Sequence, residues 1–257
     1  MGFNSRIEDD ILIFTLTNPA NGYAIDSSVL NGLEAAVNQV NINDEVSGLI
    51  LTGQDRFFCS GLCLKTLVSF TSRQEMIDWF KFQDEVLYKL FTCAKPVIAA
   101  INGHCVGGGM YLALACDHRL IRNHPKIKVG LPEINLGLGI APITGEVIRF
   151  GLDSDKRYRE VMFSGNYYDP QSTVDLGVFD EVLGYDVDII AYAKNKIVQF
   201  NGKYPKAFVY IKQTEKQHSA KIMQEEFKAY NWNTIAEHFN DKQITTNLKK
   251  VLQSMKK

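Results

Sequence analysis

A single glutamate, Glu133, lies within residues 129–142, a run made otherwise of apolar residues, glycines, prolines and one asparagine. Burial in such surroundings disfavours the charged form of a carboxyl group, so we expect the pKa of Glu133 to be raised. A carboxyl group with a raised pKa suits proton transfer near neutral pH. The alternative is that Glu133 caps a turn or pairs with an arginine, which is commonplace for glutamates.

Two glycine-containing segments could present backbone N–H groups to a ligand. Gly61 follows a strand-like run that ends at Gly53, and a glycine at such a corner can leave the N–H of Leu62 pointing outward. Three glycines, residues 107–109, open an Ala/Leu-rich helix, where free N–H groups and the macrodipole favour negative charge. Both segments therefore suit an oxyanion, and the alternatives are a simple turn and close helix-to-sheet packing.

Alternating strands and helices must position these groups. Short apolar runs rich in β-branched residues predict strands at 11–16, 46–51, 96–101 and 118–121, and helical periodicity predicts helices at 27–43 and 73–91. Polar residues at 26–28 and 71–72 are typical N-caps for these two helices. The alternation predicts an α/β fold of β-α units whose strands are buried on both faces.

Composition excludes several classes of function. The 257 residues include 28 Lys and Arg against 29 Asp and Glu, a formal charge of −1, so no basic footprint for nucleic acid or anionic membrane is present. Five cysteines in apolar surroundings are typical of reduced thiols, and neither they nor the five histidines show the spacing of a metal site. No stretch approaches the length of a membrane span, and no secretory signal is present, so we expect a soluble cytoplasmic protein.

The chain changes character after about residue 201. The remaining residues are rich in lysine and carry large apolar side chains, including Phe208, Phe227, Trp232 and Phe239. Such a segment must dock on other protein surface. It either folds back over the core of its own chain or packs against another subunit.

The order and spacing of three motifs give a specific resemblance. The motifs are F-x-x-G-L at 58–62, N-G-x-x-x-G-G-G-x-x-L-A-L-A-C-D-x-R at 102–119 and G-L-P-E-x-x-L-G at 130–137. Together they resemble the crotonase (enoyl-CoA hydratase/isomerase) superfamily over residues 11–183. The resemblance implies a spiral of ββα units in two nearly perpendicular sheets, with residues 1–200 as the core. It implies that residues 201–257 form a helical oligomerisation region, giving a homotrimer or hexamer.

The resemblance also implies roles for individual residues. The N–H groups of Leu62 and Gly108 would form the oxyanion hole for a thioester carbonyl, and one such donor is typically worth about 2.7–4 kcal/mol in the transition state. Hydratases of the family use two glutamates, whereas this chain has Tyr111 at the first position and Glu133 at the second. The pattern resembles the monofunctional Δ3,Δ2-enoyl-CoA isomerases, in which one glutamate moves a proton from C2 to C4. Tyr111 could line the acyl pocket, or its hydroxyl could orient substrate or a water.

Substrate binding follows from the same resemblance. Ala24 lies in a stretch, residues 23–25, that resembles the family's coenzyme A-binding loop, and Ala24 and Gly61 would bind the substrate. Lys65 either approaches the coenzyme A phosphates or adenine or is a solvated surface lysine. Coenzyme A would enter as part of the substrate, with no separate cofactor. Asp117 and Arg119 are charged residues at a strand start, and we interpret them as structural. The alternatives to isomerisation are hydration, thioester hydrolysis, decarboxylation, or binding of acyl-CoA without catalysis.

Overall fold

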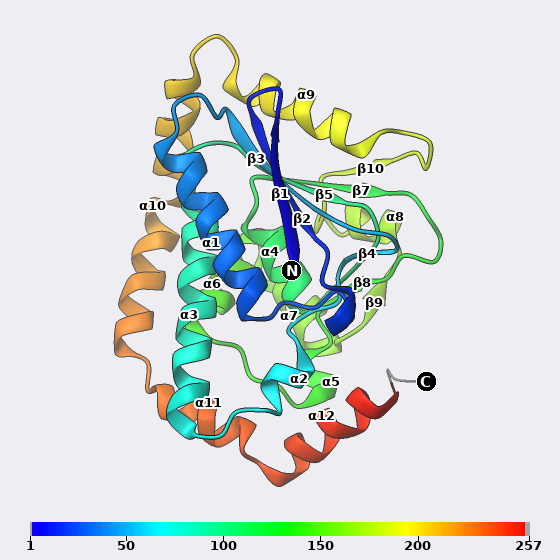
Figure 1. Ribbon diagram of the computed structural model, residues 1–257, viewed down its shortest axis with the longest axis vertical. Coiled ribbons are helices and arrows are strands. Elements are labelled where there is room, and N and C mark those ends of the chain that lie inside the picture. Colours follow the sequence, from blue (N-terminus) through cyan, green and yellow to red (C-terminus); the bar gives the residue numbers. More distant parts are fainter. Residues whose placement is uncertain (1, 255–257) are drawn as a thin grey trace.

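The computed structural model describes residues 2–254, which form two sheets wrapped by helices (Figure 1). The six-stranded sheet has the order β1-β2-β3-β5-β7-β10, and the four-stranded sheet has the order β4-β6-β8-β9. The strands are β1 Phe3–Glu8, β2 Ile11–Leu16, β3 Gly48–Gly53, β4 Phe57–Cys59, β5 Val97–Ile101, β6 His104–Val106, β7 His118–Arg122, β8 Val129–Gly130, β9 Tyr167–Tyr168 and β10 Glu181–Leu183.

The helices of the described residues fall into a group interleaved with the strands and a C-terminal group. The first group is the 3₁₀ helix η1 Pro19–Asn21, α1 Ser27–Ile42, α2 Leu64–Leu67, α3 Arg73–Phe91, α4 Gly108–Ala115, α5 Glu133–Leu136, α6 Pro142–Gly151, α7 Asp155–Ser164 and α8 Pro170–Asp175. The second group is α9 Ile189–Asn201, α10 Pro205–Ala229, α11 Trp232–Phe239 and α12 Lys242–Ser254. Within residues 2–254, no helix combines the length and the apolarity needed to cross a bilayer.

The chain crosses repeatedly between the two sheets. β3, β5 and β7 lie in the large sheet, and each is followed directly by a strand of the small sheet, β4, β6 or β8, and then by helix. Neighbouring strands of this series pair in parallel. β1 and β9 add one antiparallel pairing to each sheet, so both sheets are mixed. The predicted ββα repetition and two-sheet architecture are confirmed.

The large sheet is covered on both faces, which explains its nearly continuous apolar strands. Ile11 and Ile13 of β2 pack toward α9, together with Ile197 of that helix. Leu12 and Phe14, which point to the opposite face, belong to the main core with the buried residues of α1 and α3. The alternation along one strand therefore joins two separate apolar layers.

The predicted elements agree with the observed ones to within two residues. The side chain of Asp26 accepts a hydrogen bond from Val29 N at the start of α1, and Ser72 accepts one from Glu75 N at the start of α3. The strand predicted at 46–51 is found at Gly48–Gly53. The two-residue displacement follows from the pairing of β3 with β2, in which Gly48 lies opposite Ile11 and Gly53 lies opposite Leu16.

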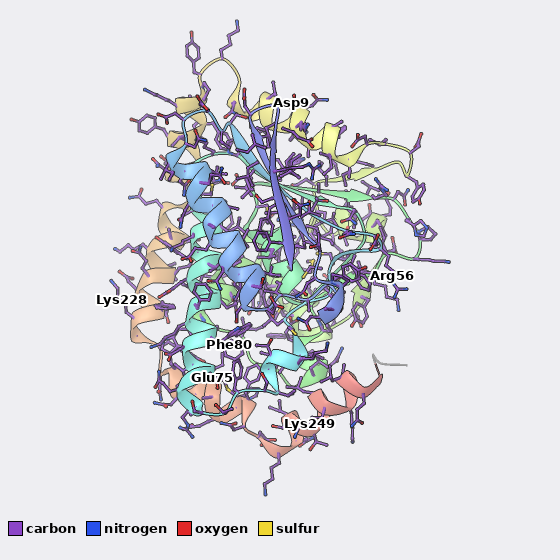
Figure 2. All side chains as sticks on the ribbon, in the orientation of Figure 1. Asp9, Arg56, Glu75, Phe80, Lys228 and Lys249 are labelled. Carbon is purple, nitrogen blue, oxygen red and sulfur yellow. The ribbon has the colours of Figure 1, made fainter. Side chains whose placement is uncertain are left out.

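The C-terminal helices dock on the core of their own chain. α10 packs against α6 and α9, α11 against α3, and α12 against α2 and α5. Figure 1 shows this tail passing around the outside of the core, so that α12 comes beside α2 and α5. Phe80 of α3 and Phe239 of α11 meet with ring centroids 4.7 Å apart, whereas Lys228 and Lys249 project outward (Figure 2).

Candidate active site

Three parallel neighbours of the small sheet bring the predicted residues together. β4, β6 and β8 lie side by side, so their carboxyl ends meet at one edge. The segment after β4 holds Gly61 and Leu62, the segment after β6 holds Gly108, and the segment after β8 holds Glu133. Sites of α/β proteins commonly form at the carboxyl ends of parallel strands.

A glycine with positive φ precedes each of the two predicted N–H donors, Leu62 and Gly108. Gly61 has φ 107°, and Gly107, which precedes α4, has φ 53° and ψ −121°. Such positive φ values strain residues that carry a Cβ. The two turns approach closely, since a Cβ on Gly108 would lie 3.2 Å from Leu62 N. Within residues 2–254, neither Leu62 N–H nor Gly108 N–H donates to a protein acceptor.

Glu133 is buried beside this pair of turns, with 5% of its surface exposed. Its Oε1 accepts a hydrogen bond from the Tyr111 hydroxyl at 2.5 Å. Its Oε2 is buried and has no hydrogen-bond partner among the described residues. A Cβ on Gly107 would lie 3.1 Å from Oε1, so the carboxylate packs against the backbone at the start of α4.

Burial controls the protonation of the site. It raises the pKa of Glu133, and the hydrogen bond from Tyr111 offsets part of this shift. Burial also raises the pKa of Tyr111 well above its ordinary value, and the negative charge of Glu133 adds to the effect. Tyr111 therefore remains a neutral hydrogen-bond donor. Burial, and after it the negative charge of Glu133, raises the pKa of Tyr167 of β9.

One cavity of about 670 Å³ contains the whole predicted set. The residues named from the sequence that line it are Ala24, Gly61, Leu62, Lys65, Gly108, Tyr111 and Glu133. A hollow of about 810 Å³ lies toward the other end of α4, around Asp117 and Arg149, and is lined by none of the seven. The smaller cavity is the candidate site because it holds the unpartnered carboxylate oxygen and the free N–H groups.

 Ala24 lies next to Gly61, since Ile25 N donates to Gly61 O at 2.8 Å and Cys63 N donates to Ile25 O at 2.8 Å. The exposed ammonium of Lys65 donates to Ala20 O at 2.7 Å and to Asn21 Oδ1 at 3.2 Å. In this structure Lys65 therefore ties α2 to η1, and its role toward coenzyme A stays a prediction.

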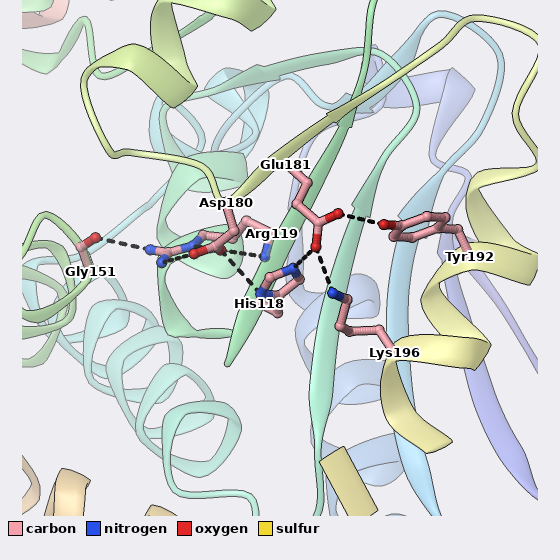
Figure 3. Close-up of polar contacts among 7 residues, drawn as sticks. All are labelled: His118, Arg119, Gly151, Asp180, Glu181, Tyr192 and Lys196. Atoms are coloured by element: carbon pink, nitrogen blue, oxygen red, sulfur yellow. Dashed lines mark hydrogen bonds and ion pairs between the residues drawn. The ribbon is translucent and has the colours of Figure 1, made fainter. Parts of the chain in front are cut away.

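Asp117 and Arg119 lie outside the cavity and do not pair with each other. Asp117 accepts hydrogen bonds from Lys212 and Lys216 of α10. Arg119 pairs with Asp180 at 2.9 Å and donates to the carbonyl of Gly151, as Figure 3 shows. Both residues have structural partners, in keeping with the interpretation from the sequence.

Several cavity residues were not singled out from the sequence. They are apolar or polar side chains from α5, β9 and α12, among them Asn135, Leu136, Tyr167, Val251 and Leu252. The apolar character of the tail was the only signal for the last two. No sequence pattern indicates that α12 should reach back to α2 and α5.

This geometry defines an enzyme site of a recognisable class. Two free N–H groups can stabilise an oxyanion that develops on a carbonyl, and a buried carboxylate can move a proton beside it. The model of the enoyl-CoA hydratase/isomerase family matches residues 6–254. The chain therefore belongs to this family, the crotonase superfamily, and is an acyl-CoA enzyme of the hydratase or isomerase type.

Proteins of similar sequence or similar fold are known. A Bacillus subtilis (strain 168) protein described as "Probable enoyl-CoA hydratase" is 27% identical over 199 residues, covering 77% of this chain and 76% of that protein. The human mitochondrial delta3-delta2-enoyl-CoA isomerase superposes with a TM-score of 0.90 at 21% identity, covering 100% of this chain and 98% of that one. An enoyl-CoA hydratase from Bacillus halodurans superposes with a TM-score of 0.84 at 19% identity, covering 97% of this chain and 100% of that one. The predicted fold class is confirmed.

Proposed function

We propose that this chain converts 3-enoyl-CoA thioesters into trans-2-enoyl-CoA thioesters, with Glu133 as its single acid and base. The observation that carries the proposal is that Glu133 is the only carboxylate among the described residues lining the cavity. Hydration of a double bond needs one group to activate water and a proton donor for carbon, whereas a 1,3-proton shift needs one group that acts twice. The nearest protic side chain, Tyr111, is a neutral donor already bonded to Glu133.

The reaction follows from the placement of these groups. The thioester oxygen accepts hydrogen bonds from Leu62 N–H and Gly108 N–H, which lowers the energy of the enolate form. The ionised carboxylate of Glu133 removes a proton from C2, and the electron pair delocalises over the thioester oxygen, C2 and C4. The protonated Glu133 then returns the proton to C4, so that the double bond moves from C3–C4 to C2–C3 and Glu133 is restored.

The rest of the cavity supports a coenzyme A thioester as substrate. Its volume of about 670 Å³ lies within the usual range for small-molecule sites. Lys65 is the only cationic side chain among the described residues that line it, and it stands at the rim where phosphates would meet solvent. Apolar side chains, including Leu136, Leu138 and Leu252, line the side toward α5 and α12 and suit an acyl chain.

The test is a paired spectrophotometric assay of wild type and Glu133→Gln with 3-enoyl-CoA and 2-enoyl-CoA of several chain lengths. We expect wild type to isomerise 3-enoyl-CoA without forming 3-hydroxyacyl product. Loss of the acid and base should reduce turnover of Glu133→Gln by at least about 10²–10⁴-fold. Glu85→Gln, a change at an exposed glutamate of α3, is the matched control and should retain activity.

Two results would contradict the proposal. Turnover of 3-enoyl-CoA by Glu133→Gln within a few-fold of wild type would remove Glu133 from the mechanism. Efficient hydration of 2-enoyl-CoA by wild type would instead assign the chain to the hydratases of its family.

The proposal extends to assembly and compartment. A homotrimer or hexamer would cover exposed apolar side chains at the corner of α9 and α10, where Val198, Tyr204, Tyr210 and Ile211 are each at least 65% exposed. Sedimentation equilibrium of the purified chain tests the assembly, and a monomer at micromolar concentration would contradict it.

The five cysteines are free and buried, which suits a reducing compartment such as the cytoplasm.

A further inference from the structure

The two oxygens of the Glu133 carboxylate have different surroundings. Oε1 accepts the hydrogen bond from the Tyr111 hydroxyl, and Oε2 has no partner among the described residues. A buried polar atom without a partner is costly, so such atoms in native proteins call for an explanation. A substrate proton would supply the partner that Oε2 lacks.

We propose that Tyr111 is a positioning residue that holds Glu133 through Oε1, so that Oε2 carries the proton in both transfers. The inference rests on the proposed isomerisation, because it assigns the oxygen that performs it. Tyr111 itself takes no proton from the substrate. Its hydroxyl proton is engaged with Oε1, and a neutral phenol is a weak base.

The fold makes this restraint rigid. Tyr111 and Gly108 lie on the same helix, α4, so one element orients both the carboxylate and a donor to the thioester oxygen. The Tyr111 side chain is 5% exposed, and its backbone N–H donates to Gly107 O. Gly107 closes the other side of Oε1, where a Cβ would come within 3.1 Å. Rotation of the carboxylate would therefore break the bond from Tyr111.

The same bond stabilises the ionised form of Glu133, so its removal should raise the pKa of that carboxyl further. Other titratable groups face this pair from several elements. Tyr167 of β9 feels the charge of Glu133, while Asp84 of α3 and Tyr158 of α7 act on Tyr111. None of them supplies a hydrogen bond to Glu133 within residues 2–254.

The test compares Tyr111→Phe, which removes only the hydroxyl, with Tyr192→Phe. Tyr192 is the matched control because its hydroxyl also donates to a glutamate, Glu181, at 2.5 Å, but at the edge of the large sheet (Figure 3). We expect Tyr111→Phe to lower kcat about 10–100-fold, with KM within about threefold, as loss of one charge-assisted hydrogen bond predicts. The acid limb of the kcat/KM profile should move to higher pH by about one unit.

A second measurement does not depend on turnover. The carboxyl of Glu133 can be titrated in the free enzyme by ¹³C NMR, with Glu133→Gln identifying its signal. The midpoint should lie at higher pH in Tyr111→Phe than in wild type and should not move in Tyr192→Phe. Adding Tyr111→Phe to Glu133→Gln should cause less than a threefold further loss, because the tyrosine acts through the glutamate.

The outcomes separate the two proposals. If Glu133→Gln retains turnover, the isomerase mechanism fails, whatever the titration gives. If Glu133→Gln is inactive while Tyr111→Phe leaves the titration midpoint and kcat unchanged, the positioning role alone is wrong. Loss in Tyr111→Phe as complete as in Glu133→Gln, with an unmoved midpoint, would instead make Tyr111 a second acid and overturn the inference.

Discussion

We expect Asp117→Asn to destabilise the protein by about 3–5 kcal/mol, because it removes the shared counter-charge of two buried lysines. Asp117 accepts from Lys212 at 2.5 Å and from Lys216 at 2.7 Å, and these three side chains are at most 8% exposed. Val97 N also donates to the same carboxylate at 2.8 Å. The cluster joins α10 to the core at the start of β7.

The magnitude follows from what the change leaves behind. Burial opposes ionisation of Asp117, but the charges of Lys216 and Lys212 hold its pKa below the ordinary value. Without Asp117, two ammonium groups would remain in the core. Lys216 keeps the carbonyl of Phe91 as a partner and lies 4.4 Å from the centroid of the Phe91 ring, which limits the loss. For a chain of this size, 3–5 kcal/mol corresponds to a fall in Tm of roughly 6–20 °C.

Urea unfolding followed by circular dichroism measures this difference. Glu237→Gln is the control, because its partner Arg73 and Glu237 itself are 50% and 62% exposed and such pairs contribute little. Replacing the whole cluster, with Asp117→Leu, Lys212→Met and Lys216→Met together, should recover most of the stability. A loss below about 1 kcal/mol in Asp117→Asn would refute the reasoning that these charges depend on one another.

Two further predictions concern pH and backbone conformation. Burial raises the pKa of Glu181, but the hydrogen bonds that its carboxylate accepts, of which the one from Lys196 has the largest effect, lower the pKa to about 2. Glu181 therefore contributes stability above its ordinary pKa and loses it as pH falls from about 4.5 toward 2, so Glu181→Gln should cost about 1–2 kcal/mol at pH 7 and progressively less below pH 4. Urea unfolding at pH 7 and pH 3 checks this, and an equal cost at both values would contradict it. Gly107→Ala should destabilise the fold by about 1–3 kcal/mol, because φ at this position is 53°. It should also lower kcat at least about tenfold, because the new Cβ would contact Glu133 Oε1. Unchanged steady-state kinetics would contradict this prediction.

Much of the local structure could be predicted from the sequence because its causes are local. The N-caps Asp26 and Ser72 act within three residues of the helix starts that they stabilise. Residues 73–91 form α3 as the periodicity predicted. The observed ends of β3 differ by two residues from the predicted ones, because they are set by pairing with β2, a strand more than 30 residues earlier in the sequence.

The candidate site divides in the same way. The three motifs and their resemblance to the crotonase superfamily predicted Gly61, Gly108 and Glu133 as site residues from the sequence by itself, and the structure places all three at one cavity. The sequence could not determine that Tyr111 binds Oε1 and leaves Oε2 unpartnered, because that depends on the orientation of α4 relative to α5.

Tertiary structure alone also decided what the C-terminal residues do. Lys212 and Lys216 meet Asp117 from positions 95 and 99 residues away, and Val251 and Leu252 of α12 reach the cavity wall. Composition indicated only that this segment must dock. Helix periodicity and capping act over a few residues, whereas the choice of docking surface depends on which faces the folded core leaves available.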